Sequence, residues 1–420
     1  MNIETERLRT RPEYTVYVPK SLDGSTHDTG NEHFLVFESP DGGLAAVWTQ
    51  STAEGEPDQR IVFARSGDEG RSWTPPRVIA GPAPAADGGL ASWGFPLVSN
   101  SGRIYVIYNQ HIGVNDLFTH TTGLMAGIYS DDAGQTWSEA QVIPMRRSKW
   151  DSPNASIPSN WIVWQKPQRL SEGKYLVGLT RWVSPAVRHP PPIDHWTAAE
   201  SVVEFMHFEN VDDDPEPRKM VIRNFAPDDE ALRVALPDYP EVSVAQEPSI
   251  VALPDGRLFT AMRTQTGHPF CSVSDDAGRT WSRPQIMRRH DGGPQLLHPL
   301  SPCPIYALGE GRYIFLHHNH DGHFERYGPL DTSDHRRPIT LCLGEYRAGA
   351  EQPIWFSAPK HLMDNDGVPI GYGMGRCDLA MYSSFTDRGG RRVLWYPDRK
   401  FFLLGKVIPN EALAGLTVPA

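Results

Sequence analysis

The sequence predicts an all-β fold, a six-bladed β-propeller formed as one domain over residues 1–420. Two observations support this prediction. An eight-residue pattern, Ser-x-Asp-x-Gly-x-Ser/Thr-Trp, occurs three times, at residues 66–73, 130–137 and 274–281. A second element, in which two apolar runs flank a glycine turn, occurs six times. Repeats of this kind are typical of propellers, in which each repeat forms one blade.

The eight-residue pattern has the residue types of a tight turn followed by a buried ring. Its Asp and Ser or Thr side chains can bond to the turn's own backbone, and its Gly can adopt a positive φ. Its Trp can bury a large ring between layers. Trp73 and Trp137 are 64 residues apart, and Trp137 and Trp281 are 144 apart, or two steps of 72. This spacing indicates that one copy between the second and the third has decayed.

The six hairpins give the blade count. The clearest hairpin runs from Glu247 to Arg263. No further strand pattern follows residues 401–407, so the sixth blade lacks an outer strand from the C-terminal part of the sequence. We expect residues 14–18 to supply this strand and close the ring. Two long polar insertions, residues 112–122 and 183–200, are expected to form loops above one face, where specificity usually resides.

The inner hairpins also predict which side chains face the central channel, because the leading strand starts there and the returning strand ends there. The leading positions are His33, Phe95, Lys166, Glu247, Cys303 and Tyr382. The returning positions are Thr49 or Gln50, Asn109, Thr180 or Arg181, Arg263, His318 and Tyr396. This ring mixes acids, bases and phenols, which a purely structural channel would not require.

Composition narrows the classes of function. The net charge is −11 and the basic residues are scattered, so a nucleic-acid partner is not expected. No apolar run approaches the length of a membrane span, so no membrane partner is expected. The N-terminus lacks the apolar core of a secretory signal, so we expect a cytoplasmic protein, or a secreted or periplasmic one if a signal was removed. The sequence predicts no oligomeric state.

Four cysteines are expected to be buried free thiols, since none has the spacing of a metal-binding pair. They are Cys271, Cys303, Cys342 and Cys377. We therefore expect no metal and no cofactor.

The eight-residue pattern resembles the Asp-box, or BNR repeat, of the sialidase (neuraminidase) superfamily. The resemblance implies a propeller of the sialidase type. It also implies that the Asp-box is structural and distant from the active site, so Asp68, Asp132 and Asp276 are expected to be non-catalytic.

Two further stretches resemble catalytic segments of that family. Gln246-Glu247-Pro248, with Arg263 at the end of the same hairpin, is similar to the segment that holds a catalytic Glu and a carboxylate-binding Arg. Residues 381–385 are similar to the segment that holds a nucleophilic Tyr, here Tyr382. A neutral Tyr is a weak nucleophile, and a Glu within hydrogen-bond reach can take its proton. The resemblance therefore implies a retaining, exo-sialidase-like glycosidase, and sialidases are known to use Tyr in this way.

The sequence departs from the family at the groups that bind the substrate. The family uses three arginines, of which only Arg263 aligns well. His33 lies near the first-blade position, and the fifth-blade stretch at residues 301–304 offers no Arg, although Arg376 could approach from another loop. A clamp with one Arg is weaker and less selective than one with three. We therefore expect a carbohydrate substrate with an anionic group, other than ordinary sialic acid.

Two more substrate-binding candidates come from the ring of channel positions. Lys166 and His318 carry the right charge or hydrogen-bonding groups, and for these residues and His33 a structural role is an equal alternative. The family places its acid catalyst in the loop before the first Asp-box. Glu54, Glu56 and Asp58 all fall in that loop, and position favours Asp58.

Two other functions stay open. A lyase acting on a uronic-acid polysaccharide would use Lys or Arg to neutralise the carboxylate and Tyr or His to remove the neighbouring proton. A non-catalytic glycan-binding propeller is the third possibility, since one fold supports many functions.

Overall fold

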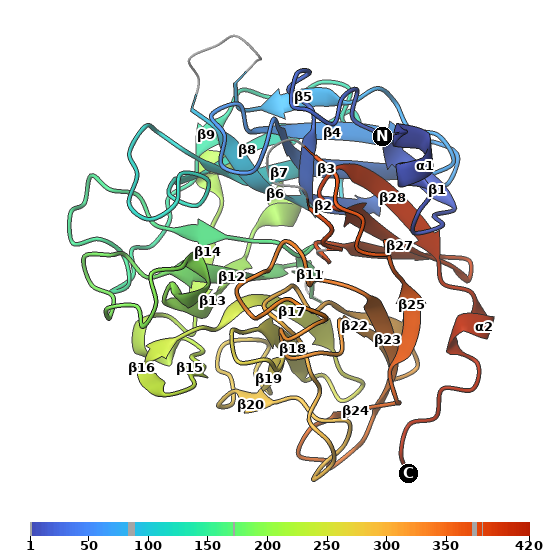
Figure 1. Cartoon of the computed structure of the whole chain (residues 1–420). Helices are drawn as coiled ribbons and strands as arrows, with labels where there is room; N and C mark the ends of the chain where they lie inside the picture. Colours follow the sequence, from blue (N-terminus) through green and yellow to red (C-terminus); the bar gives the residue numbers. More distant parts are fainter. Residues whose placement is uncertain (1, 83–88, 171–172, 372–375, 380) are drawn as a thin grey trace.

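Six antiparallel sheets surround a common centre in this computed structural model, which describes residues 2–82, 89–170, 173–371, 376–379 and 381–420 (Figure 1). Each sheet is one blade, so the predicted six-bladed propeller is confirmed. A small two-stranded sheet, β15 (Ala235–Leu236) with β16 (Tyr239–Ser243), lies between the third and fourth blades in the sequence. None of the helices in the described part of the chain is long and apolar enough to span a membrane.

The first three blades follow one another along the chain. Blade 1 contains β2 (Gly30–Glu38), β3 (Leu44–Ser51), β4 (Arg60–Ser66) and β5 (Arg77–Ala80). Blade 2 contains β6 (Ala91–Val98), β7 (Ile104–Gln110), β8 (Leu124–Ser130) and β9 (Gln141–Val142). Blade 3 contains β10 (Trp161–Ile162), β11 (Gln168–Arg169), β12 (Tyr175–Trp182), β13 (Ser201–Phe208) and β14 (Ile222–Phe225).

The last three blades complete the ring. Blade 4 contains β17 (Gln246–Ala252), β18 (Leu258–Arg263), β19 (Phe270–Ser274) and β20 (Gln285–Ile286). Blade 5 contains β21 (Ile305–Gly309), β22 (Arg312–His317), β23 (Ile339–Tyr346), β24 (Ile354–Phe356) and β25 (Lys360–Met363). Blade 6 contains β26 (Ser384–Arg388), β27 (Arg391–Asp398), β28 (Phe402–Val407) and β1 (Tyr14–Tyr17).

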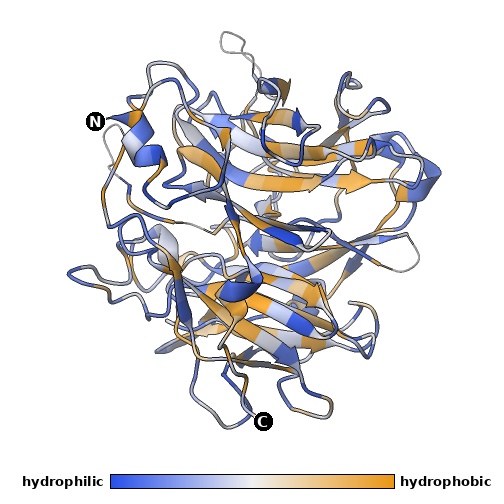
Figure 2. Cartoon of the chain, turned by 90° about the vertical axis from the view of Figure 1, so that its right-hand side faces the viewer, coloured by the Kyte–Doolittle hydropathy of each residue, from blue (hydrophilic) through white to orange (hydrophobic). Residues whose placement is uncertain are grey.

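Helical segments are short. They are α1 (Ile3–Arg7), α2 (Asn410–Leu413) and the 3-10 turns η1 (Trp196–Ala198), η2 (Val211–Asp213), η3 (Pro217–Lys219) and η4 (Asp228–Glu230). Hydrophobic residues concentrate in the strands and hydrophilic ones in the connecting loops (Figure 2). The stability of the fold therefore comes from apolar side chains packed between blades.

The N-terminal strand β1 forms the outer strand of blade 6. Its residues pair with β28 in antiparallel register, Tyr14 with Gly405 and Thr15 with Leu404. Tyr14 is buried, and its ring lies 5.3 Å from that of Trp395 on β27. The two ends of the chain thus share one sheet, which joins the first and last parts of the ring.

The three Asp-boxes follow β4, β8 and β19 and have the predicted turn geometry. In the first box, Asp68 accepts hydrogen bonds from the backbone N–H of Ser72 (2.9 Å) and from its hydroxyl (2.6 Å). Gly70 has φ +84°, and a Cβ there would lie 2.3 Å from Trp395 of the neighbouring blade. The box therefore needs glycine both for its backbone conformation and for close packing between blades.

The Trp of each box packs against the preceding blade in the ring. Ring centroids lie 5.7 Å apart for Trp73 and Trp395, 5.1 Å for Trp137 and Phe63, and 4.3 Å for Trp281 and Phe205. Each motif thus connects two blades.

Candidate active site

A cavity of about 400 Å³ lies at the centre of the propeller, and all six blades contribute to its lining. One wall is apolar and aromatic, formed by Trp93, Phe118, Ile162, Trp182 and Trp196. The charged and phenolic side chains that line it are Glu54, Glu247, Arg263, Arg336, Arg376, Asp378, Tyr382 and Lys400. The predicted loops at residues 112–122 and 183–200 supply Phe118, His120 and Trp196 to this cavity. An apolar wall with a few convergent polar groups is typical of a small-molecule site.

Tyr382, Glu247 and Arg263 form a buried triad in this cavity. The Tyr382 hydroxyl donates a hydrogen bond of 2.9 Å to Glu247 Oε1. Arg263 Nη1 donates to the Tyr382 oxygen at 3.1 Å and lies 3.0 Å from Glu247 Oε2. Arg263 is held from behind by Gln246 Oε1, which accepts from its Nε at 2.9 Å. The guanidinium is therefore fixed between two acceptors and the phenol.

Burial sets the charge states of the phenol and the acid. It raises the pKa of Glu247, against the opposing charge of Arg263 and the hydrogen bond from Tyr382. Burial and the neighbouring Glu247 raise the pKa of Tyr382 well above its usual value. The phenol is therefore neutral at rest, and it needs Glu247 to accept its proton if it is to act as a nucleophile.

Three inner strands each contain a β-bulge at the equivalent position, and each bulge directs a side chain toward the propeller axis. The register shifts in β2, β6 and β17, where His33, Trp93 and Glu247 have φ of 52°, 57° and 49°. A positive φ is costly for such residues and is typical of functional positions. Glu247 is held there by its backbone N–H, which donates to Thr180 Oγ1 at 2.7 Å.

This bulge corrects one expectation from the sequence. In blade 2 the residue equivalent to Glu247 is Trp93, whereas the expected start of the inner hairpin had pointed to Phe95. Trp93 lines the cavity, and its ring stacks on His33 at 3.2 Å between centroids. A bulge shifts alternation by one residue, and nothing in the local sequence marks it.

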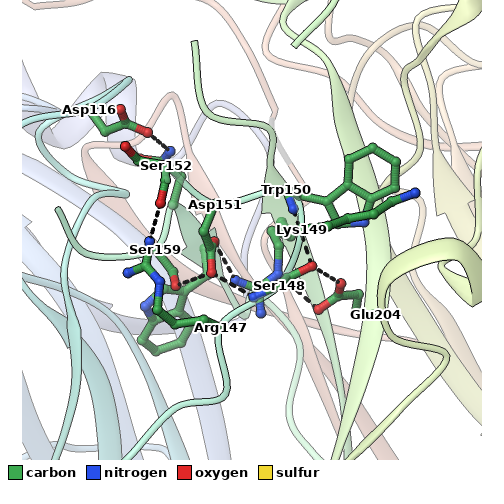
Figure 3. A network of polar contacts seen from close by, with 12 residues as sticks. Asp116, Arg147, Ser148, Lys149, Trp150, Asp151, Ser152, Ser159 and Glu204 are labelled. Carbon is green, nitrogen blue, oxygen red and sulfur yellow. Dashed lines mark hydrogen bonds and ion pairs between the residues drawn. The ribbon is translucent and has the colours of Figure 1, made fainter. Parts of the chain in front are cut away.

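Blade 3 supports the triad through a buried ionic network. Arg181 follows Thr180 on β12 and donates to Asp151 Oδ1 and Glu204 Oε2, both at 2.8 Å. Ser148 Oγ donates to Glu204 Oε1 at 2.9 Å, its backbone N–H donates to Asp151 Oδ2 at 2.9 Å, and Figure 3 shows Ser148 between the two acids. All of these charges are paired, so the network fixes the connection before β10 against β12 and β13.

Arg336 also lines the cavity, although the hairpin pattern does not predict it. It is 4% exposed, donates from Nε to the Leu300 carbonyl at 2.9 Å, and lies 3.9 Å from Asp378. It comes from the β22–β23 connection. Residues 301–304, the fifth-blade stretch in which an Arg was sought, contain none. The carbonyl of the neighbouring Leu300 accepts the hydrogen bond from Arg336. Such a contact between two loops leaves no signal in the hairpin pattern.

Arg376 and Lys400 complete the cationic lining around Glu54. Arg376 Nη1 lies 3.5 Å from Glu54 Oε2. Lys400, in the turn between β27 and β28, contacts Glu54 Oε2 and lies 2.9 Å from Glu32 Oε2. The sequence aligned only Arg263 well with the family's arginines. The cavity lining contains three arginines, Arg263, Arg336 and Arg376, and one lysine, Lys400.

Asp58 does not line the cavity, in contrast to its expected role as acid. Its carboxylate accepts from the backbone N–H of Thr52 (3.0 Å) and from its hydroxyl (2.7 Å). Glu54, in the same loop, turns its side chain to the cavity instead. Position in the sequence could not separate the two acids, because a loop does not alternate like a strand.

Three expected substrate-binding residues also lie outside the lining. Lys166 lies near the charge of Glu38. Glu38 is the last residue of β2, at the opposite end of this strand from its channel-facing start. His318 lies 2.9 Å from the Pro338 carbonyl and 3.0 Å from Ser301 Oγ, so its ring nitrogens are occupied. His33 supports the site from behind, with its ring 5.3 Å from that of Tyr382.

One group of side chains has the composition of a metal site. Glu32, His33 and Glu54 each offer an atom within 4.8 Å of the others. The Lys400 ammonium lies against both carboxylates, however, and already supplies the positive charge. This group is a salt-bridge cluster and not a metal site.

Comparisons with known proteins agree with this architecture. The sequence matches the BNR repeat-like domain over residues 42–372. The protein belongs to the BNR repeat-like domain family. A comparison with curated proteins finds no match.

Several solved structures share the fold of this BNR repeat-like protein. One is a Dyadobacter fermentans protein described as of unknown function, with 13% identity and a TM-score of 0.59, over 94% of this chain and 96% of that one. The intramolecular trans-sialidase from Ruminococcus gnavus has 13% identity and a TM-score of 0.58, over 96% and 99% of the two chains. The NanB sialidase from Streptococcus pneumoniae has 13% identity and a TM-score of 0.58, over 94% and 70%. At this identity the likeness shows the fold alone.

Proposed function

We propose that the protein is a retaining glycoside hydrolase that acts on a sugar with an anionic group. The observation that carries this proposal is the 2.9 Å hydrogen bond from the Tyr382 phenol to Glu247, with Arg263 against both. The sialidase-superfamily fold and a cavity of about 400 Å³, which suits one sugar unit, support it.

Each residue has a definite role in the proposed reaction. Tyr382 Oη attacks the anomeric carbon while its proton passes to Glu247, and the glycosidic C–O bond breaks as Glu54 protonates the leaving oxygen. Water then attacks the same carbon, giving its proton to Glu54, and the Tyr382 oxygen leaves and recovers its proton from Glu247. Two inversions give net retention. Glu54 takes the role expected of Asp58 because Glu54 lines the cavity.

The arginines indicate how the anionic group is held. Arg376 and Lys400 pair with Glu54, so the guanidinium groups on the Tyr382 side are Arg336 and Arg263, of which Arg263 is itself paired with Glu247. Two arginines form a smaller clamp than the three that the resemblance implies. We therefore expect a sugar acid other than N-acetylneuraminic acid as the best substrate.

The test is a panel of aryl glycosides of hexuronic acids and nonulosonic acids, with mass detection of the products. We expect release of one acidic sugar, with the first-formed anomer retained when followed by NMR. Efficient release of N-acetylneuraminic acid from a simple aryl sialoside would contradict the substrate class. No turnover of any glycoside would contradict the hydrolase itself.

A uronic-acid lyase is the second candidate, and His120 favours it. This histidine lines the cavity 3.9 Å from Glu54, where it could remove a proton next to a carboxylate. A lyase would form an unsaturated product with a new ultraviolet absorbance, and the hydrolase would not. The same panel, extended to uronic-acid oligosaccharides, separates the two.

A further inference from the structure

Glu54 is surrounded by positive charge, which is unusual for a residue that must donate a proton. Lys400 contacts its carboxylate, Arg376 lies at 3.5 Å, and His120 at 3.9 Å. Burial favours the neutral acid, but the charges of Lys400 and Arg376, with the nearby His120 ring, hold the pKa of Glu54 well below its usual range. Glu54 is therefore an anion at rest and has to obtain a proton before it can protonate a leaving oxygen.

Glu32 is the group that can hold this proton. It lies at the start of β2, 2% exposed, and does not line the cavity. Its Oε2 is 2.9 Å from the Lys400 ammonium, which also contacts Glu54, so one ammonium lies between two carboxylates. Burial and the charge of Glu54 raise the pKa of Glu32 to about 7.

The neighbouring charges explain why the pKa of Glu54 is lowered and that of Glu32 is raised. Arg376 forms its ion pair with Glu54, and Lys400 is shared. The remaining neighbours of Glu32 include the His33 Nε2 atom at 3.9 Å, and the pKa of His33 is held well below its usual value by burial. Two neighbouring carboxylates that share one buried ammonium repel each other when both are ionised, which favours a proton on one of them.

We propose that Glu32, Lys400 and Glu54 form one acid–base unit in which Glu32 stores the proton that Glu54 delivers to the leaving oxygen. This proposal rests on the proposed hydrolase function. Lys400 gives a proton to Glu54 as it takes one from Glu32, so Glu32 becomes a carboxylate, Glu54 a carboxylic acid and Lys400 is unchanged. When Glu54 later takes a proton from water, the same transfer in reverse returns it to Glu32.

Lys400 is suited to this transfer because it is held in place. It is 6% exposed and lies in a tight turn in which Arg399 and Lys400 have φ of 58° and 60°. Its ammonium is also 5.6 Å from the centroid of the Tyr382 ring, so the unit and the nucleophile share one side of the cavity. Glu32 is accordingly a positioning residue that acts through Glu54.

The kinetic test uses two aryl glycosides of the same sugar that differ in leaving group. A dinitrophenyl glycoside needs no proton, whereas an unsubstituted phenyl glycoside does. We expect Glu54→Gln to lower kcat on the phenyl substrate by roughly 10²–10⁴-fold and to leave the dinitrophenyl substrate within about tenfold. Glu56→Gln, an exposed glutamate of the same loop, is the control and should leave both unchanged.

Glu32→Gln should act on the pH profile. Without Glu32 as a proton store, protonation of the leaving oxygen depends on the low pKa of Glu54 itself. The basic limb of kcat for the phenyl substrate should therefore move to lower pH by at least about one unit. The dinitrophenyl profile should stay in place. A Glu32→Gln profile that superimposes on the wild type, or an equal loss on both substrates at unchanged Tm, would overturn the proposal.

A second measurement needs no turnover. Infrared difference spectra against pH should show a protonated carboxyl band that disappears near pH 7 in the wild type and in Glu56→Gln, and that is missing in Glu32→Gln. A wild type without this band overturns the proton store, whatever the activity. Absence of turnover on every glycoside with the band present overturns the hydrolase function instead.

Discussion

Tyr382 is suited to the proposed nucleophilic role because burial keeps the phenol neutral and Glu247 lies within hydrogen-bond reach as a base. The hydrogen bond to Glu247 orients the phenol, and Arg263 holds both groups from one side. A carboxylate nucleophile in the same place would repel an anionic substrate, and a neutral phenol does not. For the proposed reaction, the site would therefore combine an uncharged nucleophile with arginines that bind the substrate's anionic group.

Arg336 should act in binding more than in bond cleavage. It reaches the cavity from the β22–β23 connection with a planar guanidinium, which suits a carboxylate. We expect Arg336→Lys to raise KM for the acidic substrate by about 10- to 100-fold, with a smaller change in kcat. The KM of the corresponding sugar amide should change little.

Steady-state kinetics on both substrates measure this difference. Arg326→Lys, an exposed arginine of the same connection, is the matched control. A loss confined to kcat would contradict the binding role of Arg336.

At the scale of elements, the Asp-box is a stabilising turn. Asp132 accepts from the Thr136 N–H (2.8 Å), the Thr136 hydroxyl (2.6 Å) and the Ser130 hydroxyl (2.8 Å). Asp132→Ala should lower the free energy of unfolding by about 1 kcal/mol for each bond lost. The activity of the folded fraction should be unchanged, since Asp132 does not line the cavity.

Urea unfolding and specific activity test this together. Asp275→Ala, an exposed Asp beside the equivalent residue of the third box, should change neither. A mutant of Asp132 with normal stability and no turnover would overturn the structural assignment.

At the scale of the whole molecule, acid should destabilise the fold through the histidines of blade 5. Burial lowers the pKa of His317 and of His335 to about 4, against 6.5 for an ordinary histidine. These groups are neutral in the fold, whereas the unfolded chain takes up protons below pH 6.5. Their contribution is complete above pH 6.5 and is lost as the pH falls from 6.5 to 4, roughly 3 kcal/mol for each histidine.

The free energy of unfolding between pH 7.5 and 4.5 measures this slope. His335→Leu removes a buried ring whose nitrogens both lack hydrogen-bond partners, and should flatten the slope. His323→Leu, which removes an exposed histidine, should leave the slope unchanged. An identical slope in His335→Leu and the wild type would contradict the burial argument.

The whole fold followed from the sequence because its repeats are local patterns. The Trp spacing and the six hairpins give the number of blades, and the motif around Glu247 and Arg263 gives half of the site. Arg336 and Lys400 could not be placed, since each reaches the cavity from a connection whose path depends on the assembled ring. Trp93 was missed because the inner strand of blade 2 begins earlier than its hairpin pattern suggests, with a bulge between Ser92 and Phe95.

The central claim is that Tyr382 and Glu247 act as one unit, and a double-mutant comparison of kcat tests it most directly. Tyr382→Phe and Glu247→Gln should each lower kcat by roughly 10²–10⁴-fold at unchanged Tm. The double mutant should be within about tenfold of either single mutant, because residues that act as a unit are not additive. Near-wild-type turnover in Tyr382→Phe, or losses that multiply in the double mutant, would contradict the account.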